Sequence, residues 1–172
     1  AQAWPPRTWG SIYERAAYQA ERLQKLERNA PNEFVFARSA GDVQRALDEG
    51  KLAGVYGIEG AHPLEGDLDN IARLYDKGLR VMGLQHFFDN ELGGSLHGQS
   101  GAGLTPFGKQ AVDAAVRQGM IIDVAHSSEA VVRDVLARTE KPVIVSHTGL
   151  KGHCDTARNI PDDLMQAIAD HG

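Results

Sequence analysis

The sequence is poor in cysteine, in long apolar runs and in surplus positive charge, and each shortage removes a class of protein. Cys154 is the only cysteine, so neither an internal disulfide nor a paired-thiol metal site can form. No run of about 18 apolar residues suggests a membrane-spanning helix. The formal net charge is -5, so nucleic acid and anionic membrane surfaces are not expected partners. A small molecule is the expected partner.

Length and composition are those of one ordinary globular domain. The chain has 172 residues, of which 42% are hydrophobic and 24% charged, so we expect a single domain over residues 1–172. The start lacks the pattern of a signal peptide, and the scarcity of cysteine slightly favours a cytoplasmic location. The last residues read as an unfinished helix, so we expect a fragment of a larger protein.

Two helices are expected before residue 51. Residues 11–29 place apolar side chains at helical spacing with charges on the opposite side, which is typical of a surface helix. Residues 39–50 begin at Ser39, a plausible N-cap, and end at Gly50, a plausible C′ glycine.

From residue 52 onward, strand-like and helical segments alternate. The strand-like segments are "LAGVYGIEG" (52–60), "LRVMGLQHF" (79–87), "MIIDVAHSS" (120–128) and "PVIVSHTG" (142–149). The helical segments that follow them are residues 68–78, 105–119, 128–139 and 160–172, with Thr105 and Ser128 as expected N-caps. Four strand-helix units in series predict an α/β protein with a parallel sheet.

One long irregular stretch, "DNELGGSLHGQSGAG" (89–103), interrupts this series. It is rich in glycine but matches no phosphate-binding fingerprint. Loops of this length in compact domains are usually lids or binding loops, so we expect it to form part of a site's wall.

Each of the four strand-like segments leads to a side chain that can bind a metal or move a proton. These are Glu59, His86, His126 and His147. In a parallel sheet or barrel the carboxyl ends of the strands meet on one face, so the four side chains should lie together. Any one of them could be a structural residue, but gathering a carboxylate and three imidazoles is costly unless a cation compensates them. The set predicts a metal site.

The ligand types favour zinc. Carboxylate and imidazole suit zinc or another first-row divalent ion better than calcium or magnesium, which take mainly oxygen ligands. A zinc ion with an open position lowers the pKa of bound water to about 7, so a metal-activated hydroxide becomes available at neutral pH. The sequence therefore predicts hydrolysis.

Further polar residues lie close to these strand ends. Asp123, inside the third strand-like segment, is a candidate for orienting a metal ligand. Arg158 precedes the last helix, and its planar guanidinium suits a substrate carboxylate. The remaining histidines and Cys154 are expected to be surface or loop residues: His62, His97, His153 and His171.

Six short motifs occur in a fixed order along the chain. They are "GIEGAH" (57–62), "LQHFFDN" (84–90), "LTPFGKQAV" (104–112), "IDVAHSS" (122–128), "SHTG" (146–149) and "RNIPDD" (158–163). Together they resemble the membrane dipeptidase (renal dipeptidase, peptidase M19) family, from about Phe36 to the end. The resemblance implies a partial (β/α)8 TIM barrel of the metal-dependent hydrolase type, about strands 3 to 6 with their helices. It also implies two zinc ions and hydrolysis of dipeptides, including those with D-residues at the carboxyl end.

The same resemblance assigns roles. Glu59 would bridge the two metals, and His126 and His147 would complete the ligands of the second. His86 would stabilise the oxyanion of the tetrahedral intermediate, and Arg158 would hold the substrate's terminal carboxylate.

The family's pattern is only partly present. The first metal of the family also takes a His-x-Asp pair, and none precedes Glu59 in this sequence. An aspartate near the end of the last strand would lie beyond Gly172. We therefore expect at most one fully liganded metal position, and the sequence leaves open whether the chain is active by itself.

Two alternatives remain open. One is another amidohydrolase-type metal hydrolase that acts on a cyclic amide or ester, although Arg158 favours a dipeptide. The other is a catalytically silent, truncated metal-binding module. The sequence leaves open the side-chain preference and the oligomeric state, a homodimer included.

Overall fold

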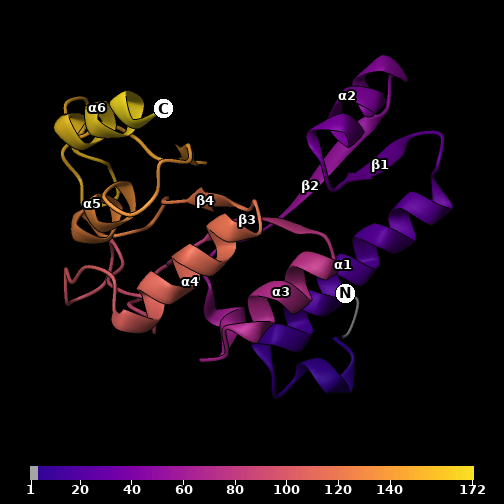
Figure 1. Cartoon of the computed structure of the whole chain (residues 1–172), viewed down its shortest axis with the longest axis horizontal. Helices are drawn as coiled ribbons and strands as arrows, with labels where there is room; N and C mark the ends of the chain where they lie inside the picture. Colours follow the sequence, from indigo (N-terminus) through magenta and orange to yellow (C-terminus); the bar gives the residue numbers. More distant parts are fainter. Residues whose placement is uncertain (1–3) are drawn as a thin grey trace. The chain divides into compact units, whose positions relative to one another are not determined.

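The computed structural model describes residues 4–172 and has the predicted α/β architecture. Its strands are β1 (Phe34–Ala37), β2 (Leu52–Ile58), β3 (Leu79–Gly83), β4 (Ile121–Asp123) and β5 (Val143–Ile144). They follow one another across the sheet in chain order, and the pairs β1/β2 and β4/β5 are parallel. Figure 1 labels the first four of these strands.

Every predicted helix is present. The helices are α1 (Ile12–Asn29), α2 (Ala40–Asp48), α3 (Asp69–Asp76), α4 (Pro106–Arg117), α5 (Glu129–Leu136) and α6 (Asp162–His171), with 3-10 turns η1 (Pro6–Thr8) and η2 (His62–Leu64). Ser39, Thr105 and Ser128 cap their helices as predicted, each accepting a backbone N–H in the first turn. Among residues 4–172, no helix combines the length and the apolar character needed to cross a bilayer.

All four expected strands are present, and β1 adds a fifth that the sequence pattern did not predict. All four of its residues are buried, so "FVFA" shows neither alternation nor a helical period. The backbone N–H of Phe36 donates to Glu27 Oε1 at 2.9 Å, which ties the strand to α1. A four-residue buried run between two helices carries too little pattern to be recognised.

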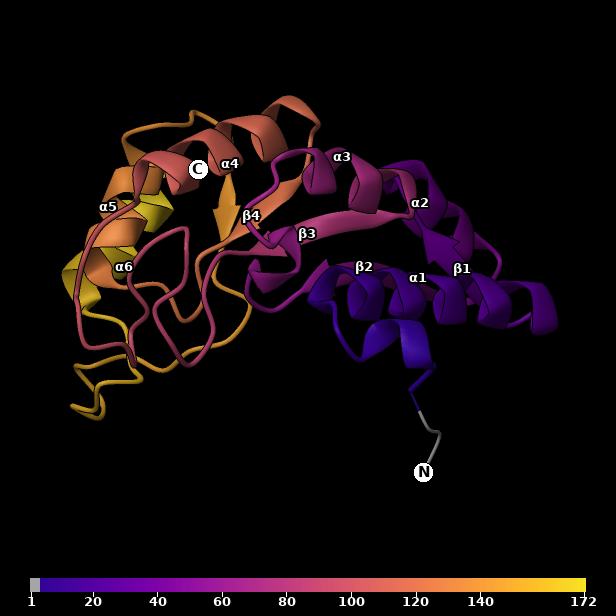
Figure 2. The same cartoon turned by 90° about the horizontal axis from the view of Figure 1, so that it is seen from below.

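The described chain divides into two compact units. The first comprises the residues up to Ile58 together with Pro63–Val81. In it, α1 and α2 both contact β1 and β2, and Figure 2 shows α1 running along these strands. Its core contains Phe36, Leu64, Ile71, Leu74 and Leu79, all fully buried.

After α3 the chain of the first unit turns at Gly78, whose φ is +108°. A Cβ at this position would lie 2.5 Å from the Phe36 ring, so only glycine fits both the backbone conformation and the space.

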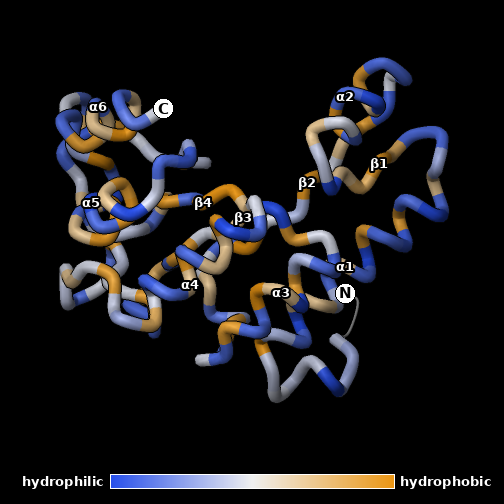
Figure 3. Tube along the Cα trace, in the orientation of Figure 1, coloured by the Kyte–Doolittle hydropathy of each residue, from blue (hydrophilic) through white to orange (hydrophobic). Residues whose placement is uncertain are grey.

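The second unit comprises Glu59–His62 and Met82–Gly172. Its core is built on Met82, Leu84, Leu92, Ile122 and Leu164, and in Figure 3 the chain at β4 carries the hydrophobic colour. The N–H of Ala61 donates to the carbonyl of Leu84 at 3.1 Å. This bond fixes the segment that carries Glu59 beside the end of β3.

We expect two helical glycines to respond oppositely to alanine. A Cβ on Gly108, in the first turn of α4, would lie 2.0 Å from the carbonyl oxygen of Leu92. Because backbone must move, Gly108→Ala should lower the free energy of unfolding by about 1–3 kcal/mol. Gly41→Ala meets only Ser39 Oγ at 3.7 Å and should raise it by about 0.5 kcal/mol. Denaturant unfolding measures both, and equal effects would contradict the proposed packing of α4 on Leu92.

Candidate metal centre

Unusual backbone conformations accompany two of the predicted site residues. Gly60, directly after Glu59, has a φ of +91°, and a Cβ there would lie 2.7 Å from His62 Nδ1. His126 has a φ of +65°, which is uncommon outside glycine. Its carbonyl accepts the N–H of Leu96 at 2.7 Å, which helps to hold this conformation. Strain of this kind clusters at functional sites.

The structure brings Glu59, His86, His126 and His147 together in the second unit. Glu59 Oε1 lies 3.0 Å from His126 Nε2, 3.1 Å from His147 Nε2 and 3.5 Å from His86 Nε2. The Nε2 atoms of His126 and His147 are 2.9 Å apart. Four side chains from four strand ends thus turn their donor atoms toward one point.

This donor set fits a divalent cation. One carboxylate oxygen cannot accept a well-formed hydrogen bond from each of three ring nitrogens, and two Nε2 atoms in contact can share only one proton. Burial, followed by the charge of Arg158, lowers the pKa of His126, so its ring stays neutral at neutral pH, the form that binds metals. A cation would accept the lone pairs of all these atoms.

Two overlapping triads can supply the ligands. The ligand atoms of Glu59, His86 and His126 lie within 4.8 Å of one another. The predicted ligand set instead takes His147 in place of His86, and its contacts with Glu59 Oε1 are shorter. The roles of the individual side chains stay predictions.

Arg158 lies against this group. Its Nη2 donates to the carbonyl oxygen of His147 at 3.1 Å. Arg158 Nη1 and His126 Nδ1 are buried without a hydrogen-bond partner in residues 4–172, and both side chains line a cavity of about 10 Å³. The structure thus places Arg158 beside His126 and His147. The pairing of Arg158 with a substrate carboxylate stays a prediction.

Two aromatic rings that were not predicted to belong to the site lie beside the histidines. The Phe87 ring is 51% exposed, and its centroid lies 4.2 Å from that of His86 and 5.7 Å from that of His126. His97, expected to be a surface residue, is exposed, yet its ring lies 5.8 Å from that of His126. The only sequence signals for their position are that Phe87 directly follows His86 and that His97 lies in the long loop of residues 89–103. Cys154 is exposed, as expected.

The loop of residues 89–103 lies along the same group, as predicted. The carboxylate of Asp89 accepts the N–H groups of Ser95, Gln99 and Ser100 at 2.8, 3.2 and 3.0 Å. Ser95 Oγ also donates to the carbonyl of His86. One carboxylate therefore organises a stretch that has little secondary structure of its own.

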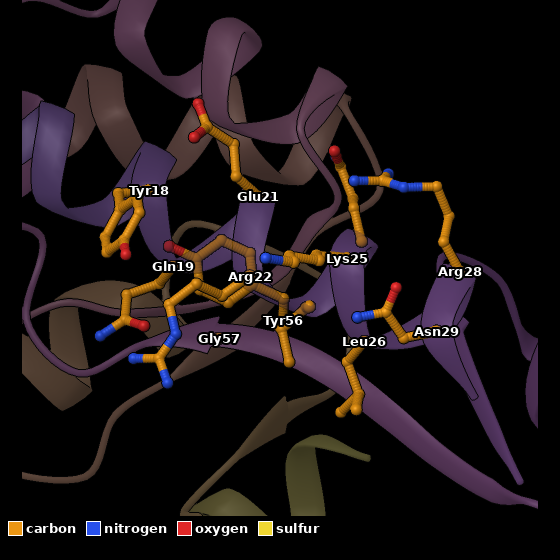
Figure 4. A pocket seen from close by; sticks show the side chains of 12 residues that line it. Tyr18, Gln19, Glu21, Arg22, Lys25, Leu26, Arg28, Asn29, Tyr56 and Gly57 are labelled. Atoms are coloured by element: carbon orange, nitrogen blue, oxygen red, sulfur yellow. The ribbon is translucent and has the colours of Figure 1, made fainter. Parts of the chain in front are cut away.

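A separate hollow of about 1000 Å³ lies in the first unit, broadly open to solvent. Figure 4 shows that it is lined by side chains of α1 with Tyr56 and Gly57 of β2. None of the predicted site residues lines this hollow, and its polar side chains do not gather into a set that indicates a particular ligand.

Comparison with known proteins gives a consistent result. The family described as membrane dipeptidase (peptidase family M19) matches residues 3–172. An amidohydrolase from Pseudomonas aeruginosa superposes with a TM-score of 0.88 at 25% identity, over 94% of this chain and 50% of its own.

Two further solved structures are similar. The probable dipeptidase PvdM from Pseudomonas aeruginosa has a TM-score of 0.83 and 31% identity, over 88% of this chain and 40% of its own. A metallo peptidase from Rhodobacter sphaeroides, liganded with a phosphinate mimic of the dipeptide L-Ala-D-Ala, has a TM-score of 0.77 and 26% identity, over 88% and 45%. The chain spans half or less of the length of these structures.

The Asp89 carboxylate should make the loop sensitive to acid. Hydrogen bonds from the N–H groups of Ser95 and Ser100 hold the pKa of Asp89 below its usual 3.8. Because this pKa is lower in the folded than in the unfolded chain, the ionised carboxylate stabilises the loop at pH values above the ordinary pKa. This contribution is lost as the pH falls through the lower pKa of the folded state. We expect the amide NMR shifts of Ser95, Gln99 and Ser100 to move together below about pH 4. In Asp89→Asn this transition should be absent, and its persistence would refute the assignment.

Proposed function

Because the chain belongs to the membrane dipeptidase family, peptidase family M19, we propose that the protein is a zinc-dependent dipeptidase. The observation that supports this most directly is the approach of three imidazole nitrogens to Glu59 Oε1, at 3.0, 3.1 and 3.5 Å. The family membership and the donor geometry are independent lines of support for a metal-dependent hydrolase.

Glu59, His126 and His147 would hold the cation. Zinc suits a mixed set of one carboxylate and two imidazoles better than calcium or magnesium does. When bound, such an ion supplies a Lewis acid that polarises the scissile carbonyl and makes water more acidic. The partial exposure of Glu59 and His147, with side chains 54% and 47% exposed, leaves this position open to a substrate.

His86 and Arg158 would act on the substrate. Of the three Nε2 atoms that approach Glu59 Oε1, that of His86 is the farthest, at 3.5 Å, so its ring can donate an N–H to the oxygen that becomes negative in the transition state. The guanidinium of Arg158 would pair with the terminal carboxylate of the dipeptide. The phosphinate dipeptide mimic bound to the Rhodobacter sphaeroides relative supports a dipeptide substrate, including one with a D-residue at the carboxyl end.

Removal of a proposed ligand should abolish tight metal binding. We expect His126→Ala and Glu59→Gln to weaken zinc affinity by at least about 100-fold, because each removes a direct ligand from a small set. Competition with a chromophoric chelator measures the affinity. His153→Ala, an exposed histidine of the same unit, is the matched control and should bind zinc like the wild type. Equal affinity in all variants would contradict the site.

Substrate chemistry separates the dipeptidase from its alternatives. With added zinc, we expect hydrolysis of L,L and L,D dipeptides, and loss of activity with a chelator. Turnover of lactones or cyclic amides alone would favour another amidohydrolase-type hydrolase. Tight zinc binding without any turnover would favour a catalytically silent metal-binding module.

The role of Arg158 can be tested with the same panel. Arg158→Ala should lower kcat/KM about 100-fold for dipeptides with a free carboxyl group, since an ion pair of roughly 3 kcal/mol is lost. For the matching dipeptide amides, which lack that charge, the change should be small. An equal loss on both substrates would show that Arg158 does not read the carboxylate.

A further inference from the structure

We propose that Asp123 and Ser146 are positioning residues that fix the tautomer of His147, with the proton on Nδ1 and the lone pair on Nε2. The inference deepens the proposed function and rests on it only in giving His147 a metal to bind. Neither Asp123 nor Ser146 is among the proposed ligands of the cation.

The three side chains form a continuous chain of hydrogen bonds. Asp123, at the end of β4, is 7% exposed. Its Oδ2 accepts the hydroxyl of Ser146 at 2.5 Å, and its Oδ1 accepts the N–H groups of Ser146 and Ala125 at 3.1 and 3.0 Å. Ser146 Oγ in turn lies 2.9 Å from His147 Nδ1.

Counting protons along this chain decides the tautomer. A serine hydroxyl has one hydrogen, and here it is donated to the Asp123 carboxylate, which can only accept. Toward His147 the same oxygen can therefore only accept, so Nδ1 must carry a hydrogen. In a neutral imidazole the other nitrogen, Nε2, then presents its lone pair.

That lone pair points at the proposed site. His147 Nε2 lies 3.1 Å from Glu59 Oε1 and 2.9 Å from His126 Nε2. In the opposite tautomer, Nδ1 would compete for the serine hydrogen and leave the buried Asp123 Oδ2 without a donor. The nearly buried carboxylate thus selects the form of His147 that can bind a cation.

The same carboxylate also joins the two strand ends that supply the histidines. The N–H of Val124 donates to the carbonyl of Ile144 at 2.9 Å, which pairs the chain after β4 with β5. Asp123 continues this connection two residues beyond the end of β5 by accepting hydrogen bonds from both the N–H and the hydroxyl of Ser146. It therefore sets the position of the backbone before His147 as well as the ring's proton.

The tautomer can be read directly by long-range ¹H–¹⁵N NMR of the metal-free, labelled chain. In the wild type, at a pH where the ring is neutral, we expect His147 with protonated Nδ1. Asp123→Asn can turn an amide N–H toward Ser146 Oγ and free the serine hydrogen for Nδ1, so the Nε2-protonated form should grow. A wild type protonated on Nε2, or no change in Asp123→Asn, would overturn the inference.

Metal affinity gives a second readout. Ser146→Ala and Asp123→Asn should weaken zinc binding about 10–100-fold, whereas Ser146→Thr keeps the hydroxyl and should restore it. Ser146 is exposed, so its replacement leaves no cavity. Thr105→Ala removes a hydroxyl that caps α4 in the same unit and is the control for general loss of stability.

The two proposals fail separately. If the wild type binds no zinc, the proposed function fails, while the NMR measurement still decides the tautomer. If the wild type binds zinc, and Ser146→Ala and Asp123→Asn bind it equally well, the positioning role is wrong and the metal site stands.

Discussion

The contact of Glu59 Oε1 with the ring nitrogens of three histidines is the interaction on which the functional geometry of the second unit depends. A carboxylate oxygen surrounded by imidazoles is a poor hydrogen-bonding arrangement, because the rings compete for one acceptor and two of them contact each other. Such a set is stable when a cation draws in all the lone pairs. The four side chains are therefore best understood as one candidate metal site rather than as four separate polar residues.

Backbone features hold these side chains in place. Gly60 allows the turn after Glu59, and the bond from Ala61 to Leu84 fixes that turn beside β3. His126 occupies a left-handed conformation that its neighbours maintain. Preorganisation of this kind reduces the ordering that ligand binding would otherwise require.

Two aspartate carboxylates hold the segments that surround the donor atoms. Asp89 gathers three backbone N–H groups and orders the loop that passes the histidine rings, and Asp123 orients His147 through Ser146. Both act through charge-assisted hydrogen bonds, which are more directional than apolar packing. The two aspartates thus shape the site without contacting its centre.

The sequence by itself determined the α/β alternation, the helix caps at Ser39, Thr105 and Ser128, and the four residues at the strand ends. These features are local, because caps, periodicity and the position of a side chain after an apolar run are written in consecutive residues. The gathering of Glu59, His86, His126 and His147 could also be predicted, since the ends of parallel strands share one edge.

Only the tertiary structure decided the rest. The strand β1 was too short to show a pattern, and the approach of Phe87 and His97 to His126 depends on how a glycine-rich loop folds. The chain from Asp123 through Ser146 to His147 links residues 23 positions apart, at separations where a fraction of an ångström decides whether a hydrogen bond exists. Sequence spacing carries no such distances, because they arise from the pairing of two strands and the packing around them.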